Sequence, residues 1–190
     1  MRVLIVRHSM VFWASRRAMR AAAGTQLSLG PSASVQWLGR RGLRWGGLPQ
    51  LLFRSGLVPG PPEILLIHLG GNDLGLLKGK ALIIQTRLDF ESIWRRWPGT
   101  WTAWSHMLPR CKWHEGRNVR PLNRAVKLVN REIKCFLQAR QGFTIPHPRI
   151  SITRGDLYRA DGVHLSDAGN DIFLQDLHVG LLEFLQNRWG

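Results

Sequence analysis

The chain has 190 residues, of which 44% are apolar and 21% charged, and its net charge is +15. This composition is typical of a folded globular protein, and the length predicts a single domain over residues 1–190. No apolar run approaches the roughly 18 residues that cross a bilayer, which excludes an integral membrane protein. The first apolar run has only four residues before Arg7, too short for a secretory signal. We therefore expect an intracellular protein, cytoplasmic or nuclear.

Positive charge is concentrated in two stretches. Residues 1–62 hold nine arginines and no acidic residue, and residues 110–140 hold nine Lys and Arg against two Glu. Such surfaces attract phosphate polymers without sequence preference, so non-specific nucleic-acid binding is one interpretation and a solvated face the other. Cys111 and Cys135 lack the number and spacing of a disulfide framework or a zinc site, and Cys135 is expected in the core. We predict no metal and no cofactor.

Short apolar runs predict strands, and apolar positions three to four residues apart predict helices. In chain order these are strand 3–6, helix 11–22, strand 35–38, helix 45–54, strand 63–69, helix 81–97, strand 100–105, helix 121–140, strand 149–152 and a helix from Asp167. Strands that alternate with helices pair in parallel through right-handed crossovers. The sequence therefore predicts an α/β fold, a three-layer α/β/α sandwich around a central parallel sheet.

Residues that could carry chemistry follow the predicted strands, where parallel sheets bind their ligands. Ser9 follows the first strand, Asn72 follows the third, and Asp161 and His164 precede the last helix. A serine nucleophile needs a base, and a histidine base needs a third group to fix its tautomer, so these residues could form a triad. The Ser9 N–H, the Gly42 N–H and the Asn72 amide could stabilise an oxyanion.

Each of these features also has a purely structural interpretation. A serine after a strand usually caps a turn or helix, Gly70-Gly71-Asn72 suits a turn, and Asp161 to His164 suits a surface loop. The combination at successive strand ends is what favours a catalytic site. Within the third strand and its loop, His68 is expected to be a hydrogen-bonded core residue and Asp73 to orient the loop that carries Asn72.

The order of these motifs resembles that of the SGNH hydrolases, also called GDSL-type esterases and lipases, over nearly the whole chain. The two matches that carry it are Gly70-Gly71-Asn72-Asp73 and Asp161-Gly162-Val163-His164. Residues 67–75 and 104–110 also resemble small SGNH-like proteins, some of them carried by vertebrate repetitive elements. The resemblance implies a flavodoxin-like SGNH hydrolase fold, no cofactor, and an ester-containing small molecule or lipid as substrate.

The resemblance also implies roles for single residues. Ser9 would be the nucleophile, His164 the base and Asp161 the acid that orients it. Asn72 would donate to the oxyanion together with the Ser9 N–H and a glycine, for which Gly42 is the better match and Gly39 the alternative.

The first motif departs from the family, because Arg7 stands where the family has glycine and His8 where it commonly has aspartate. Glycine permits a close approach of the backbone, so Arg7 could displace Ser9 or, pointing outward, bind an anionic group of the substrate. His8 could be a second base or a packing residue. The alternative to an esterase is a catalytically impaired module of this fold that binds nucleic acid or a partner through its arginine-rich stretches.

Overall fold

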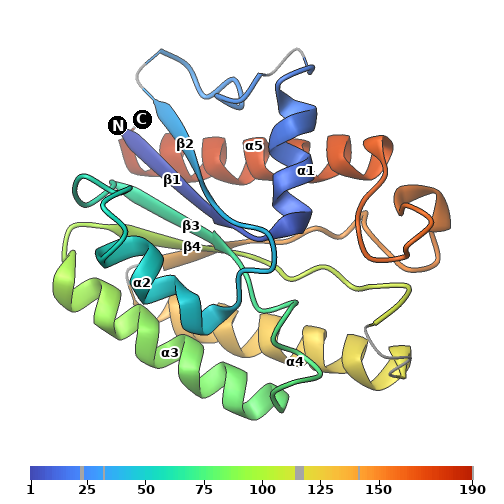
Figure 1. Cartoon of the computed structure of the whole chain (residues 1–190). Helices are drawn as coiled ribbons and strands as arrows, with labels where there is room; N and C mark the ends of the chain where they lie inside the picture. The colour runs from blue at the N-terminus through green and yellow to red at the C-terminus, as the bar shows by residue number, and fades with distance from the viewer. Residues whose placement is uncertain (22–23, 32, 114–117, 141, 190) are drawn as a thin grey trace.

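A computed structural model describes residues 1–21, 24–31, 33–113, 118–140 and 142–189, apart from the side chains of Arg7 and Trp189. One parallel sheet forms the middle layer, with the strand order β2-β1-β3-β4-β5 (Figure 1). Its strands are β1 (Arg2–Arg7), β2 (Ser34–Gly39), β3 (Ile64–His68), β4 (Trp101–Ser105) and β5 (Gly142–Ile145). Every residue of β3 is buried, as expected for a central strand covered on both faces.

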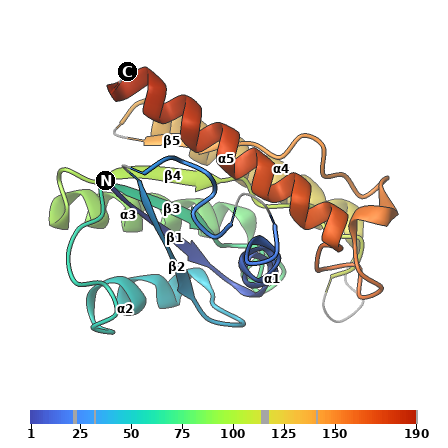
Figure 2. The same ribbon diagram turned by 90° about the horizontal axis from the view of Figure 1, so that it is seen from above.

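Helices cover both faces of this sheet (Figures 1 and 2). One face carries α1 (Ser9–Ala18) and α5 (Asp167–Trp189), and the other carries α2 (Leu48–Phe53), α3 (Gly79–Arg96) and α4 (Val119–Gln138). Two single turns, η1 (Trp45–Gly47) and η3 (Gly155–Leu157), lie in the connections. The predicted three-layer α/β/α sandwich is confirmed. Among the described residues, no helix is long and apolar enough to cross a membrane.

The sheet divides the apolar core into two clusters, because neighbouring residues of a strand point to opposite faces. Leu4 and Val6 pack towards α2, α3 and α4, whereas Val3 and Ile5 pack towards α1 and α5. In the first cluster the rings of Trp45 and Trp104 lie 5.5 Å apart. A fully buried aromatic side chain removes roughly 150–250 Å² from water, or about 4–6 kcal/mol of transfer free energy. Both clusters therefore hold the strands, and the loops at their ends, in fixed positions.

The prediction of a fifth strand at residues 149–152 is wrong. The last strand is β5, in which Gly142 pairs with Thr102 and Ile145 with Ser105. A Cβ on Gly142 would lie 2.8 Å from a methyl carbon of Leu137, so the strand begins at a residue that only glycine suits. The strand holds only two apolar residues, Phe143 and Ile145, which are separated by Thr144, so the pattern in the sequence was too weak to predict it.

The prediction of a buried Cys135 is also wrong, since its side chain is exposed. The buried positions of this part of α4 are Ile133 and Leu137. Each lies two residues from Cys135, which is about 200° around the helix axis and therefore on the opposite side.

Candidate active site

Ser9 is the first residue of α1 and directly follows the N-cap residue His8. The Nδ1 atom of His8 accepts a hydrogen bond of 3.2 Å from the Met10 N–H. The ring is 2% exposed and its centroid lies 5.3 Å from that of His68. Burial, together with the nearby Arg110 and His164, lowers the pKa of His8 to about 3. Of the two interpretations for His8, these contacts favour a neutral packing and capping residue over a second base.

Arg7 pairs with Gly39 of β2 and with His68 of β3, so its backbone keeps the register of β1 to the end of the strand. Its side chain lies outside the described part of the chain. The two interpretations of Arg7, as a residue that displaces Ser9 or one that binds an anionic group, remain predictions.

Ser9, His164 and Asp161 are joined by hydrogen bonds. The Oγ atom of Ser9 lies 3.1 Å from Nε2 of His164, and Nδ1 of that ring lies 2.6 Å from Oδ2 of Asp161. Oδ1 of Asp161 accepts the N–H groups of Val163 and His164 at 2.8 and 2.9 Å. Burial raises the pKa of Asp161, but the bonds from His164 and from the two N–H groups outweigh it and lower the pKa to about 2. Asp161 is therefore a carboxylate that fixes both the loop and the imidazole.

A second contact fixes Ser9 relative to His164, because it joins α1, which begins at Ser9, to α5, which begins three residues after His164. Arg17 of α1 donates to both carboxylate oxygens of Asp171 in α5, with distances of 2.7 and 2.8 Å. This paired geometry sets the orientation of two groups as well as their separation. The serine at the start of α1 and the histidine before α5 are thus held by the same helix pair.

The loop after β3 turns sharply at Gly70, whose oxygen accepts the N–H groups of Asp73 and Leu74 at 3.0 and 3.1 Å. Gly70 has a φ of +92°, and a Cβ there would lie 2.7 Å from the sulfur of Met107, so this turn requires glycine. Asn72 follows and points its amide towards the loop after β2, where Nδ2 donates to the oxygen of Leu43 at 3.2 Å.

Asp73 ties the same two loops together. Its carboxylate oxygens accept the Trp45 N–H, each at 3.1 Å, and its side chain is 4% exposed. Burial raises the pKa of this carboxyl group, while the bond from Trp45 opposes the shift. These contacts fit the predicted role of Asp73 in orienting the loop of Asn72. His68, 1% exposed and 2.8 Å from Ser105, is the hydrogen-bonded core residue that was predicted.

Arg110 is a residue of the site for which no role was predicted from the sequence. One of its nitrogens, Nη2, donates to Oδ1 of Asn72 at 3.0 Å. The side chain is 1% exposed, and Nε and Nη1 have no hydrogen-bond partner among the described residues. It lies 4.9 Å from the ring centre of Trp113, and a Cβ on Gly71 would lie 2.8 Å from Nη2. Burial lowers the pKa of Arg110 to about 10, so it remains a cation at neutral pH.

Two asparagines of α4 hold the segment that carries Arg110. Asn123 accepts the Arg110 N–H at 3.0 Å and donates to the Arg110 oxygen at 2.9 Å. Asn130 makes the same pair of bonds to Met107, both at 2.9 Å. The two asparagines are seven residues apart and so lie on one side of the helix. In the sequence they resemble polar residues of a solvent-facing surface, and only the tertiary structure shows their role.

A cleft of about 810 Å³ brings the predicted residues together. Gly42 lines it, whereas the alternative Gly39 is the last residue of β2 and is not among the lining residues. Three cations also line it, Arg41, Arg44 and Lys112. No cluster of three or more His, Cys, Asp and Glu side chains in the described ranges could hold a metal ion. The full set of predicted residues in the cleft is Ser9, Gly42, Asn72, Asp161 and His164.

No protein-family model matches the chain, and no curated protein matches it. Several solved structures do match the fold of the chain. A GDSL-like lipase from Bacteroides thetaiotaomicron is 13% identical, with a TM-score of 0.72 over 97% of this chain and 89% of that one. The psychrotrophic esterase EstA from Pseudoalteromonas sp., in a structure inhibited by monoethylphosphonate, is 15% identical, with a TM-score of 0.67 over 97% and 98%. A candidate SGNH hydrolase from Slackia heliotrinireducens is 15% identical, with a TM-score of 0.68 over 95% and 98%. The chain has the fold of the SGNH hydrolases.

Proposed function

We propose that the chain is a carboxylic ester hydrolase that forms an acyl-enzyme on Ser9. The observation that carries the proposal is the unbroken series of hydrogen bonds from Asp161 through His164 to Ser9, at 2.6 and 3.1 Å, inside an open cleft. The names of proteins with this fold, among them lipases and esterases, support the same reaction class.

In the first half-reaction the Ser9 oxygen attacks the ester carbonyl carbon while Nε2 of His164 takes the hydroxyl proton. The tetrahedral intermediate collapses as the alcohol leaves with that proton from His164, and the acyl group stays on Ser9. Water then attacks the acyl-enzyme with His164 again as base, which releases the carboxylic acid and restores Ser9. Asp161 remains ionised throughout and holds the imidazole in the tautomer that presents Nε2 to Ser9.

Three donors are proposed for the negative charge that forms on the substrate oxygen. The Ser9 N–H lies at the N-terminus of α1, where the helix dipole favours negative charge. The Gly42 N–H and the Nδ2 group of Asn72 complete the set. Asn72 is positioned at both ends of its amide, by Arg110 at Oδ1 and by Leu43 at Nδ2.

Arg110 is therefore proposed as a positioning residue. Its bond to Oδ1 fixes which end of the amide faces the cleft, and a cationic donor on the oxygen makes the N–H groups better donors. The substrate is proposed to be an ester with a negative charge near the scissile bond, because three of the residues lining the cleft are cations.

The test is turnover of a short aryl ester together with labelling by a fluorophosphonate, which reacts with activated serines. The wild-type protein should turn over the ester and take up the label, whereas Ser9→Ala and His164→Ala should do neither while remaining folded. A folded wild-type protein that neither hydrolyses the ester nor reacts with the probe would refute the proposal.

That negative outcome is the one the alternative function expects. A catalytically impaired module that binds nucleic acid through its basic stretches would show no label, and its affinity for a DNA or RNA oligonucleotide would fall steeply with added salt. Nucleic-acid binding remains a prediction from charge alone.

A further inference from the structure

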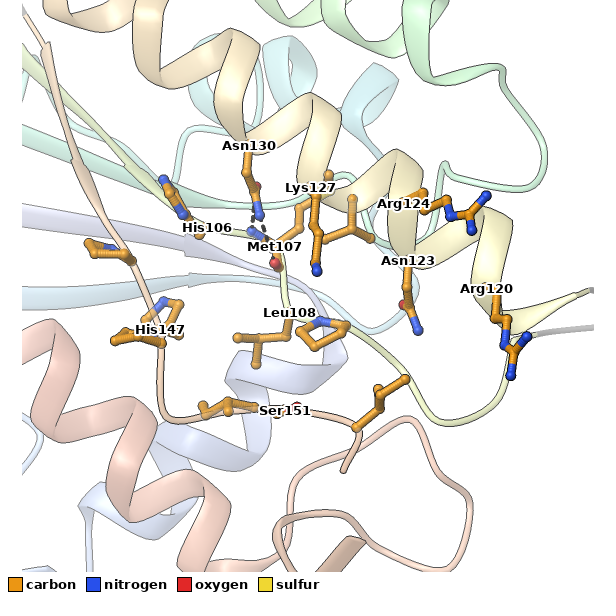
Figure 3. A pocket seen from close by; sticks show the side chains of 16 residues that line it. His106, Met107, Leu108, Arg120, Asn123, Arg124, Lys127, Asn130, His147 and Ser151 are labelled. Carbon is orange, nitrogen blue, oxygen red and sulfur yellow. Dashed lines mark hydrogen bonds between the residues drawn. The ribbon is translucent and has the colours of Figure 1, made fainter. Parts of the chain in front are cut away.

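A second cavity, of about 520 Å³, lies between α4 and the segment that follows β5. In Figure 3 the side chains of α4 form one wall, His147 and Ser151 belong to the other, and Met107 and Leu108 lie between them. A volume of this size is typical of pockets for small organic ligands. None of the triad and oxyanion residues described above lines this cavity, so it is separate from the catalytic cleft.

The wall formed by α4 is positively charged. Arg120, Arg124 and Lys127 line the cavity and are exposed, and none of them forms an ion pair with a described carboxylate. Their spacing of four and three residues places them on one side of the helix, over a length of about 10 Å. The described lining residues include no Asp or Glu. A row of cations that has no ion-pair partner among the described residues attracts a phosphate or carboxylate group.

The interior of the cavity is apolar instead. It is lined by Leu108 and Ile150, which are 3% and 4% exposed, and by Met107, Val126, Pro146 and Pro148. Asn123 and Asn130 also line it, but their amides are already bonded to the backbone of the segment that carries Arg110. The cavity thus presents a charged wall and an apolar floor.

One polar atom in this lining lacks a partner. Nε2 of His106 is buried and makes no hydrogen bond to any described residue. Burial, with contributions from His147 and Lys134, lowers the pKa of His106 to about 4, so the ring is neutral. A buried polar atom without a partner costs free energy that a ligand or water molecule bonded to it would recover.

We propose that this cavity binds an anionic amphiphile, with its phosphate or carboxylate head on Arg120, Arg124 and Lys127 and its alkyl chain over Met107, Leu108 and Ile150. Neither the cationic wall nor the apolar floor would select such a ligand by itself. An inorganic anion leaves the apolar floor exposed to water, and an uncharged alkyl chain leaves the cations without a counterion. The inference is independent of the esterase proposal, because it uses none of the catalytic residues.

The test is titration calorimetry with decyl phosphate below its micelle concentration, alongside decanol and inorganic phosphate. Decyl phosphate should bind at least tenfold more tightly than either of the others. Arg124→Glu/Lys127→Glu should weaken binding of decyl phosphate at least tenfold. Arg16→Glu/Arg20→Glu, in α1 and just beyond its C-terminal end, carries the same change of charge elsewhere and should bind like the wild type. Arg41→Glu/Arg44→Glu, in the catalytic cleft, should weaken binding much less than Arg124→Glu/Lys127→Glu does.

Two results with these variants would overturn the proposal. Equal weakening in all three double variants would show that only the net charge attracts the anion, and loss confined to Arg41→Glu/Arg44→Glu would place the ligand in the catalytic cleft. Vesicles of phosphatidylcholine with and without phosphatidic acid identify the source of the ligand. If the natural ligand is a free molecule, decyl phosphate binds in solution. Arg124→Glu/Lys127→Glu then sediments with the vesicles to the same extent as the wild type. Binding to the vesicles alone would refute a site for the free amphiphile.

Discussion

The described part of the chain contains two series of Ser, His and Asp side chains with closely similar geometry. In the first, Ser9 lies 3.1 Å from His164, which lies 2.6 Å from Asp161. In the second, Ser105 lies 2.8 Å from Nε2 of His147, whose Nδ1 lies 3.1 Å from Asp176. By distances alone the two would be equally good candidates for a catalytic triad.

They differ in access and in what surrounds the serine. Ser105 lies within β4, is 0% exposed, and also contacts Nδ1 of His68 at 2.8 Å, so its hydroxyl is held by two buried rings. Ser9 begins a helix at the edge of the sheet and lines an open cleft. The arrangement around Ser105 satisfies buried polar groups, whereas the arrangement around Ser9 leaves a reactive oxygen facing space for a substrate. A catalytic assignment therefore rests on access and on donors for the oxyanion as much as on the triad itself.

Replacing the two serines separately gives the largest expected difference. Ser9→Ala should lower kcat for an aryl ester by about ten-thousandfold or more, as for other serine nucleophiles, with little change in stability. Ser105→Ala should leave the activity of the folded protein unchanged but lower its stability by about 1–3 kcal/mol, because two buried rings lose a partner. Steady-state kinetics measure kcat of both variants, and urea unfolding measures their stability. Loss of activity in folded Ser105→Ala would contradict the distinction.

Arg110 provides the next largest effect. Arg110→Met should lower kcat by about a hundredfold, comparable to the loss of one oxyanion donor, with a small change in KM. The same variant should be no less stable than the wild type, since a buried cation with two unpartnered nitrogens is costly. Arg110→Lys should recover part of kcat. An unchanged kcat in Arg110→Met, or a fall in kcat matched by a loss of stability, would show that Arg110 does not position Asn72.

The buried histidines should make the stability of the protein sensitive to acid. Burial lowers the pKa of His8, of His68 and of His147 below the ordinary value of 6.5. Below pH 6.5 the unfolded chain takes up protons at these residues while the folded chain does not. Stability should therefore be complete well above pH 6.5 and fall as the pH drops below it, by at most about 1.4 kcal/mol per pH unit for each such histidine. Urea unfolding at pH 7.5, 6.5 and 5.5 measures the slope, and a flat profile would contradict this account.

The smallest effect concerns the cations of the catalytic cleft. The wild type should prefer an aryl ester with a carboxylate near the scissile bond over its neutral analogue, and Arg41→Glu/Arg44→Glu should reduce that preference about tenfold at low salt. The ratio of the two kcat/KM values measures the preference and cancels any general loss of activity. Equal ratios in wild type and variant would remove these arginines from substrate recognition.

The sequence predicted best what depends on short patterns. Apolar runs predicted β1 and β3, and the rule that parallel sheets bind ligands at the carboxyl ends of their strands predicted that Ser9 and Asn72 lie at one edge of the sheet. The prediction failed at β5, which holds only two apolar residues, Phe143 and Ile145. It also missed the supports of the site, because Arg110 meets Asn72 across 38 residues of sequence and Asn123 serves a backbone segment rather than solvent. Such contacts have no local signature.

The most direct test of the central claim is to treat the wild-type protein with a fluorophosphonate and to locate the adduct by peptide mass spectrometry. We predict one phosphonylated residue, Ser9, with no adduct on Ser105 and no labelling in Ser9→Ala. An adduct on another serine, or none on the folded protein, would contradict it.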